Sequence, residues 1–460
     1  IYFSKRKYMR DFLCHRKNVK KRFCRKNTGI FMMRDTGALG KFSFGKRMPD
    51  TVEIRFLSFF ILTRVKTEKS HFGDYPYTMV PKCYTTLDMA AIQQAGIAAV
   101  QNLTGLELSG EGVLVGIIDT GINYLDPIFR NLDGSTRIRR IWDQEEQSGT
   151  APREIGYGSE YTREQINLAI QSENPKETVP SFDTDGHGTF VASVACGGAN
   201  PENLFIGAAP EAEMVIVKLK EAKEYLREYY FVDCDARCYQ ENDLVAAVFY
   251  LQKVQEELKR PLVICLAVGT SFGGHGGYSI LSEYLQNVAA SEGIGIVTGS
   301  GNEADKRHHY LGILEQENNQ PVGDQCRNNT RGFVMELWTE LPNLLALSIE
   351  SPTGQTIGPV SLRRGIGEYV FVFEQTRVIF NYRVLVETTG AQLAFFQFDR
   401  PGSGIWKIIP ETLELGEWNL SYLASNGRVS DGKCLFYPCK SGIYGDGTRG
   451  YRGGGLCSVL

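Results

Sequence analysis

The sequence predicts an α/β fold, in which a parallel sheet with helices on both faces is joined to an antiparallel β-sandwich. Between residues 83 and 309, short apolar runs alternate with amphipathic stretches. Between residues 310 and 425, polar and apolar residues alternate within short runs that are separated by turn signals. We therefore expect four parts: a basic leader at 1–82, the α/β domain at 83–309, the sandwich at 310–425 and a Gly-rich irregular tail at 426–460.

Four runs in the α/β part are almost continuously apolar, as strands buried on both faces must be. These runs are residues 112–119, 214–220, 261–268 and 294–300. Helical patterns lie between them, at residues 242–258 and 279–290. Because alternating strands and helices imply right-handed crossovers, these strands should form one parallel sheet covered by helices.

Seven runs with a period of two predict the strands of the sandwich. They cover residues 333–338, 344–350, 368–374, 378–386, 391–398, 404–409 and 417–423. Turn signals such as Pro352-Thr353-Gly354 separate them, which favours an antiparallel sandwich or jelly roll. The tail from about residue 426 is rich in glycine and without periodicity, so no regular element is predicted there.

The overall composition, 42% hydrophobic and 22% charged, is that of an ordinary soluble globular protein. The net charge of -3 hides an asymmetry, because residues 1–50 hold 15 Lys and Arg but three Asp. A basic arm of this kind is typical of contact with nucleic acid or an acidic surface, or of a disordered or non-native leader. The arm has neither helical nor strand periodicity, and we expect no nucleic-acid partner.

No segment is expected to span a membrane, because the apolar run Phe56 to Leu62 is far shorter than the ~20 residues that a bilayer requires. That run also lies too deep in the chain for a secretory signal. Cys234 and Cys238 form a single C-x3-C without a second half, so no zinc site is expected. Free thiols are then the expectation, which favours the cytoplasm or a spore over secretion.

Asp119 is the first candidate for chemistry, since it ends an apolar run and is followed by Thr120 and Gly121. Its carboxylate should lie at the carboxyl edge of the sheet, where the catalytic groups of open α/β sheets gather. Aspartic proteases also use D-T-G, but they need a second such carboxylate. The other D-T-G begins at Asp35 and follows no buried strand, so that class is disfavoured.

His187 is the second candidate, in the segment DTDGHGTFVASVACGG (183–198). A histidine at the start of a helix of small residues can lie close to the sheet, where its ring can meet Asp119. That contact would fix the tautomer and stabilise the imidazolium. A lone histidine is usually structural, but G-H-G-T-x-V-A, about 70 residues after D-T-G, favours a catalytic base.

Asn302 is the third candidate, in the segment TGSGNE (298–303) that ends an apolar run. On a tight glycine turn its side-chain amide can point outward and donate to a developing oxyanion. Alone, the motif would predict only a turn.

Together these motifs resemble the subtilisin-like (subtilase) serine proteases, whose triad runs Asp, His, Ser along the chain. The resemblance covers about residues 83–305 and implies that Asp119 is the acid, His187 the general base and Asn302 the oxyanion donor. LAVGTSFGG (266–274) resembles the strand that pairs with the substrate backbone and walls the specificity pocket. The substrate-binding residues so implied are Gly269, Thr270, Ser271, Phe272 and Gly273.

Finer features resemble the clostridial germination proteases and their Firmicute relatives. They are the sandwich after Asn302 and the segments CYTTLDMAAIQQAGI (83–97), IWDQ (141–144), YTREQI (161–166) and CYQEND (238–243). In that subgroup a jelly roll separates the oxyanion Asn from the Ser, which implies that residues 310–425 are a jelly-roll-like insertion.

The nucleophile departs from the family pattern. The family's Ser lies in a G-T-S-x-A segment downstream of the Asn. The only Gly-Thr-Ser of this chain, residues 269–271, lies upstream of Asn302 in the expected substrate strand, so Ser271 is rejected as the nucleophile. The segment with the catalytic Ser is therefore expected to be missing, through truncation, frameshift or natural loss.

The resemblance thus implies a serine endopeptidase that hydrolyses peptide bonds through an acyl-enzyme and that, without the catalytic Ser, is inactive in this form. The alternative is a non-catalytic pseudoprotease that acts as a peptide-binding or germination-signalling scaffold. A protein or peptide substrate, including a proenzyme, is the expected partner, and neither a cofactor nor a metal is expected. Without the nucleophile helix, we expect the α/β part to fold poorly and the sandwich to resist proteolysis better.

Overall fold

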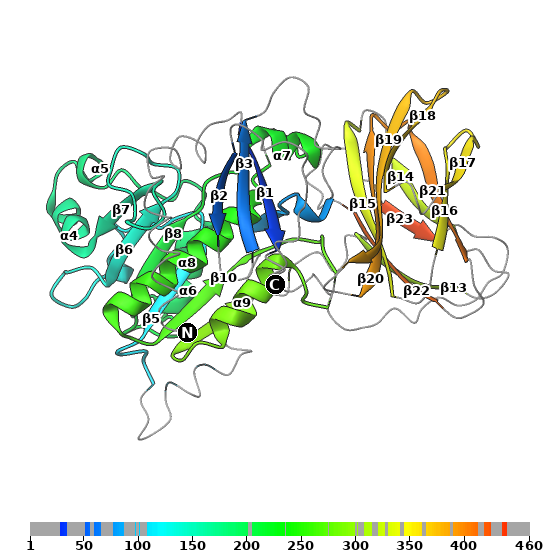
Figure 1. Ribbon diagram of the computed structural model, residues 1–460. Coiled ribbons are helices and arrows are strands. Elements are labelled where there is room, and N and C mark those ends of the chain that lie inside the picture. The colour runs from blue at the N-terminus through cyan, green and yellow to red at the C-terminus, as the bar shows by residue number, and fades with distance from the viewer. Residues whose placement is uncertain are drawn as a thin grey trace.

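The fold is described from a computed structural model of the chain (Figure 1). The described residues are 28–34, 51–55, 59–65, 77–86, 97, 101, 108–200, 205–234, 236–274, 276–299, 301, 308–314, 321–326, 330–340, 345–360, 365–386, 390–412, 418–424 and 435–438. An α/β part and a part built of antiparallel strands stand side by side (Figure 1). The predicted α/β class is confirmed.

The α/β part is built on a six-stranded sheet with the order β12-β10-β5-β8-β6-β7. Its strands are β12 (Ile294–Thr298), β10 (Leu262–Leu266), β5 (Leu114–Asp119), β8 (Glu213–Lys218), β6 (Ile138–Asp143) and β7 (Ser159–Thr162). The first five are parallel and include all four predicted strands. The edge strand β7 pairs antiparallel with β6 and was not predicted.

Helices cover both faces of this sheet. Successive strand residues point to opposite faces, so a single strand contributes to two apolar cores. On β5, Leu114 and Ile118 pack in one apolar core with α8 and α9, while Val115 and Ile117 pack in a second core with α4 and α6. The helices are α4 (Arg163–Gln171), α5 (Pro175–Thr178), α6 (His187–Cys196), α7 (Glu224–Tyr229), α8 (Glu241–Leu258) and α9 (Ile280–Ala289). Among the described residues, no helix has the length and apolarity of a membrane-spanning segment.

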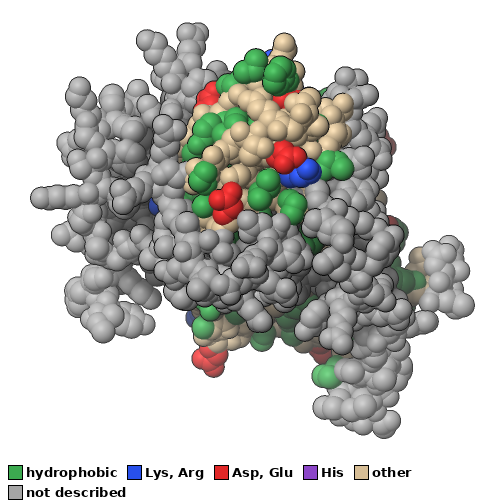
Figure 2. All heavy atoms as spheres, turned by 90° about the vertical axis from the view of Figure 1, so that its right-hand side faces the viewer, with side chains coloured by type: hydrophobic (Ala, Val, Ile, Leu, Met, Phe, Trp, Pro, Cys, Tyr) green, Lys and Arg blue, Asp and Glu red, His purple; other side chains and the backbone are tan. Residues whose placement is uncertain are grey.

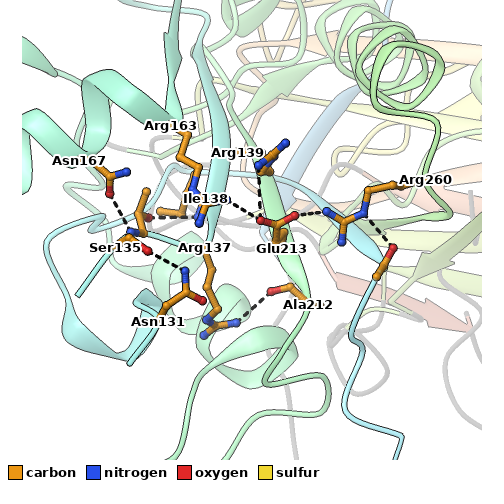
Figure 3. A network of polar contacts seen from close by, with 12 residues as sticks. Asn131, Ser135, Arg137, Ile138, Arg139, Arg163, Asn167, Ala212, Glu213 and Arg260 are labelled. Atoms are coloured by element: carbon orange, nitrogen blue, oxygen red, sulfur yellow. Dashed lines mark hydrogen bonds and ion pairs between the residues drawn. The ribbon is translucent and has the colours of Figure 1, made fainter. Parts of the chain in front are cut away.

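Charged side chains tie the amino edge of the sheet together (Figure 3). Glu213, at the start of β8, accepts a hydrogen bond of 2.8 Å from Arg163 on α4 and pairs with Arg139 on β6 at 3.6 Å. Arg260, just before β10, donates to the same carboxylate. The buried Arg137 donates to the carbonyl of Ala212 at 3.0 Å. These contacts link β6, β8, β10 and α4 at the end of the sheet opposite Asp119.

The second part consists of two antiparallel sheets that share one apolar core. The six-stranded sheet contains β13 (His309–Leu314), β22 (Trp418–Ala424), β15 (Gly332–Glu340), β20 (Ala391–Asp399), β19 (Thr376–Val386) and β18 (Ile366–Phe371). The five-stranded sheet contains β17 (Thr356–Val360), β16 (Leu345–Glu350), β21 (Gly404–Thr412), β14 (Val322–Cys326) and β23 (Leu435–Pro438). Phe398 of the first sheet and Trp406 of the second have ring centroids 5.4 Å apart in this core.

Each of the seven predicted runs overlaps a strand, and one of them is shifted along the chain. Residues 368–374 were expected to be extended throughout, but β18 ends at Phe371 and a turn with Gln375 at φ 54° follows. Val372 and Phe373 are 71% and 79% exposed there. Figure 2 looks onto the side of the molecule formed by the two antiparallel sheets, where hydrophobic side chains are more widespread than charged ones.

Strands also form where none was predicted. The basic leader contains an antiparallel sheet of β1 (Thr28–Arg34), β3 (Phe59–Val65) and β2 (Thr51–Arg55). The tail expected to be irregular contributes β23, which pairs with β14. Strands therefore occur in two segments for which the sequence pattern predicted no regular element. The rest of the tail lies outside the described residues.

Candidate active site

Asp119 and His187 meet at the carboxyl edge of the parallel sheet. Asp119 ends β5 with its side chain fully buried, and His187 is the first residue of α6. The Nδ1 atom of His187 lies 2.8 Å from Oδ1 of Asp119, which also accepts from the backbone N–H of Thr120 at 2.7 Å. Because a carboxylate only accepts, this contact places the imidazole proton on Nδ1 and leaves Nε2 as the basic nitrogen.

A glycine lets α6 approach the sheet this closely. The backbone N–H of Gly188 donates to Oγ1 of Thr120 at 2.8 Å. A Cβ atom on Gly188 would lie 2.3 Å from the carbonyl oxygen of Gly121, well inside van der Waals contact. Small residues after His187 were predicted to let the helix lie close to the sheet, and Gly188 is the position where this requirement is seen.

Asp183 joins the two motifs and was not singled out from the sequence. Its Oδ1 accepts from Oγ1 of Thr120 and from the N–H of Gly186, both at 2.9 Å. Its Oδ2 accepts from the N–H and Oγ1 of Thr189, at 2.9 and 2.6 Å. One carboxylate therefore holds the turn after Asp119 and the first turn of α6 in a fixed relation. An acidic residue four positions before His187 was the available signal.

We predict that Asp183→Asn makes the protein less stable at neutral pH by about 1–2 kcal/mol, because a charged acceptor is lost. Burial raises the pKa of the Asp183 carboxyl, but hydrogen bonds from Thr189, Gly186 and Thr120 outweigh it and lower the pKa below its usual value. A lowered pKa in the folded state contributes stability above the unfolded pKa of about 4, and this contribution is lost as the pH falls through the folded pKa.

Thermal unfolding between pH 3 and pH 7 measures this effect. The gap between Asp183→Asn and the unmodified chain should be full at pH 7 and should shrink below about pH 4. The exposed Glu177→Gln on α5 is the control and should leave unfolding unchanged. A gap that stays constant down to pH 3 would contradict the assignment.

The expected substrate-binding residues follow β10 at the same edge. Leu266 lies opposite Ile118 in the register of β10 and β5, so the chain beyond it leaves the sheet beside Asp119. Strand β11 (Val268–Gly269) then begins the segment, and Thr270, Ser271 and Phe272 are all buried. Gly273 has a φ of 106°, a left-handed conformation that favours glycine.

A strand of the same chain already lies on this segment. β4 (Cys83–Thr86) pairs antiparallel with β11, with Thr86 opposite Val268 and Thr85 opposite Gly269. The other edge of β4 pairs with β9 (Tyr239–Gln240). Main-chain pairing with an extended segment is how a sheet edge binds a peptide. The strand β9, which pairs with β4, was not predicted from the sequence.

Asn302 lies outside the described residues. The strand before it, β12, ends at Thr298, which pairs with Leu266 of β10. The N–H of Gly299 donates to the carbonyl of Leu266 at 3.3 Å, so the Asn motif begins at the same edge of the sheet. Within the described part of the chain, no three His, Cys, Asp or Glu side chains gather as a metal site would require.

Comparison with known proteins places the site in a wider context. Residues 110–361 match the profile of Peptidase S8, the subtilase family. The subtilisin-like proteases SBT2.2 and SBT2.3 of Arabidopsis thaliana are each 33% identical, over 102 and 101 residues. The alignments cover 20% of this chain and 12% of each relative, so the chain matches a small part of their length. The solved structure of the Clostridium perfringens CspB protease is 26% identical, with a TM-score of 0.63 over 74% of this chain and 67% of that one.

Proposed function

Because more than half of its residues match the subtilase profile, the chain belongs to the subtilase family, and we propose that it is a serine endopeptidase of the Asp-His-Ser type. The observation that carries the proposal is the 2.8 Å contact between His187 and Asp119, beside a strand edge that pairs with an extended segment of the same chain.

In the proposed reaction, Nε2 of His187 takes the proton from a Ser hydroxyl as its oxygen attacks the peptide carbonyl. The imidazolium that forms is stabilised by the buried carboxylate of Asp119. Asn302 is the proposed donor to the tetrahedral oxyanion. His187 then passes its proton to the leaving amine, and water hydrolyses the acyl-enzyme by the same steps in reverse.

The nucleophile is proposed to come from sequence beyond residue 433 in the intact gene. Ser271 is a poor alternative, because it belongs to the buried segment that continues β11 and is 6% exposed. These 460 residues, without that nucleophile, are accordingly proposed to be inactive.

Two experiments test the enzyme proposal. The gene is read in all frames beyond codon 433 for a Gly-Thr-Ser-x-Ala segment, and the chain that includes it is treated with a fluorophosphonate probe. Labelling of that chain, lost in His187→Ala and kept in His309→Ala, is the expected result, since the exposed His309 lies on β13. A longer chain that folds without being labelled would defeat the proposal.

A non-catalytic scaffold is the second candidate, and the pairing of β4 with β11 favours it. This pairing uses main-chain hydrogen bonds and needs no nucleophile, so peptide binding can persist without catalysis. A longer chain that binds extended peptides but never reacts with the probe would support this candidate.

We propose that the chain belongs with the clostridial germination proteases, and its likeness to the Clostridium perfringens CspB protease supports the clostridial part of this proposal. The two antiparallel sheets would then be that subgroup's jelly-roll-like insertion. The proposed partner is a protein or peptide substrate such as a proenzyme. The proposed location is the cytoplasm or the spore.

A further inference from the structure

A buried carboxylate from the sandwich reaches the segment that continues β11. Alternate residues of β15 face two environments: Phe333, Met335 and Leu337 pack in the core of the sandwich, while Glu336 points to the opposite side. That side faces the α/β part (Figure 1). The Glu336 side chain is fully buried there.

Glu336 makes its key contact with a backbone amide. Its Oε2 accepts a hydrogen bond of 2.8 Å from the N–H of Gly273 and another of 2.8 Å from Nε1 of Trp338. The N–H of Phe272, one residue earlier, donates to Oγ1 of Thr270 at 3.2 Å. Two successive amides of the segment are therefore satisfied by side-chain oxygens, and one of these oxygens comes from the sandwich.

The surroundings hold this carboxylate in place. Phe395, opposite Glu336 on β20, stacks on Tyr77 with ring centroids 3.9 Å apart. Phe272 stacks on Tyr230 at 5.3 Å. Burial raises the pKa of the Tyr77 phenol well above its usual value, and the nearby charge of Glu336 raises it further. The phenol therefore stays neutral beside the carboxylate.

We propose that Glu336 is a positioning residue for the peptide-binding segment 268–273. Its fixed acceptor determines where the Gly273 end of the segment lies, and hence how the edge of β11 meets an extended peptide. Without it, the Gly273 N–H would be buried with no acceptor, and the segment would rotate to reach one. The inference rests on the proposed function only in taking this segment as the peptide-binding one.

Amide hydrogen exchange of the full chain, followed by mass spectrometry, tests the proposal. Glu336→Leu should speed exchange in residues 268–273 by roughly 10-fold or more relative to the sandwich strands, because a charge-assisted hydrogen bond is lost. Glu336→Gln keeps an oxygen acceptor and should stay within about 3-fold of the unmodified chain. Should Glu336→Leu fail to fold, Glu336→Asp retracts the carboxylate and should give an intermediate, equally local increase.

Leu337→Ala is the matched control, because the neighbouring residue points into the core of the sandwich. It should speed exchange in the neighbouring strands β20 and β22 and leave residues 268–273 no more affected than the rest. Equal effects of Glu336→Leu and Leu337→Ala on residues 268–273 would overturn the proposal. Exchange does not depend on the nucleophile, so absence of probe labelling would sink the proposed enzyme and leave this result intact.

Discussion

Lys220→Met should destabilise the protein by about 3–5 kcal/mol, because it leaves a buried carboxylate without its cation. Asp243, in the first turn of α8, is fully buried and Lys220 is 8% exposed. The Lys220 ammonium donates to Oδ2 of Asp243, and Tyr157 and Asn242 donate to Oδ1 at 3.1 and 2.9 Å. Urea unfolding measures the loss.

Two further variants decide whether buried charge is the cause. Combining Lys220→Met with Asp243→Asn should recover part of the stability, because the unpaired charge disappears. Lys253→Met breaks a surface pair with Glu256 and should cost less than about 1 kcal/mol. A double variant as unstable as Lys220→Met alone would point to lost packing instead.

Gly188→Ala should cost about 3 kcal/mol and separate His187 from Asp119. The added Cβ would lie 2.3 Å from the carbonyl oxygen of Gly121, so α6 would have to move away from the sheet. The better helix propensity of alanine, worth about 1 kcal/mol, would not offset this overlap. Thermal unfolding measures the first effect, and probe labelling of the extended chain measures the second.

Gly295→Ala is the matched control for this substitution. Gly295 lies in β12, and its φ is outside the left-handed region. A Cβ atom added to Gly295 would have no heavy atom within 4 Å. Its replacement should leave stability and labelling unchanged. If Gly188→Ala behaved the same way, the close approach of α6 to the turn after Asp119 would not be required for the site.

The elements that could be predicted from the sequence are those that carry their own pattern. β5 and β8 are almost wholly buried, so their burial is written in consecutive residues. β12 was expected to be buried on both faces as well, but it is the edge strand of the sheet and leaves Val297 57% exposed. Asp119 and His187 could be paired in advance because each lies where a strand ends or a helix begins. The role of Asn302 as oxyanion donor stays a prediction, because Asn302 lies outside the described residues.

The elements that were missed depend on residues far away in the chain. β4 and β9 have four and two residues and exist through the pairing of β4 with β11 and with β9, so no periodicity predicts them. Glu336 occupies an alternating polar position of β15, which predicts exposure to solvent. Glu336 is buried because the α/β part covers that face of the sandwich. The alternation of polar and apolar residues along β15 does not indicate this contact.

The pairing of β4 with β11 has a consequence for any peptide that approaches the site. β4 belongs to the same chain as β11, so a free peptide must compete with an intramolecular partner whose effective concentration is set by the chain that links the two strands. A free peptide of equal intrinsic affinity would fill half of the sites only near that concentration. If the chain were cut just after β4, the segment that carries β4 and the free peptide would compete as two separate molecules. The more abundant of the two would then occupy the edge of β11.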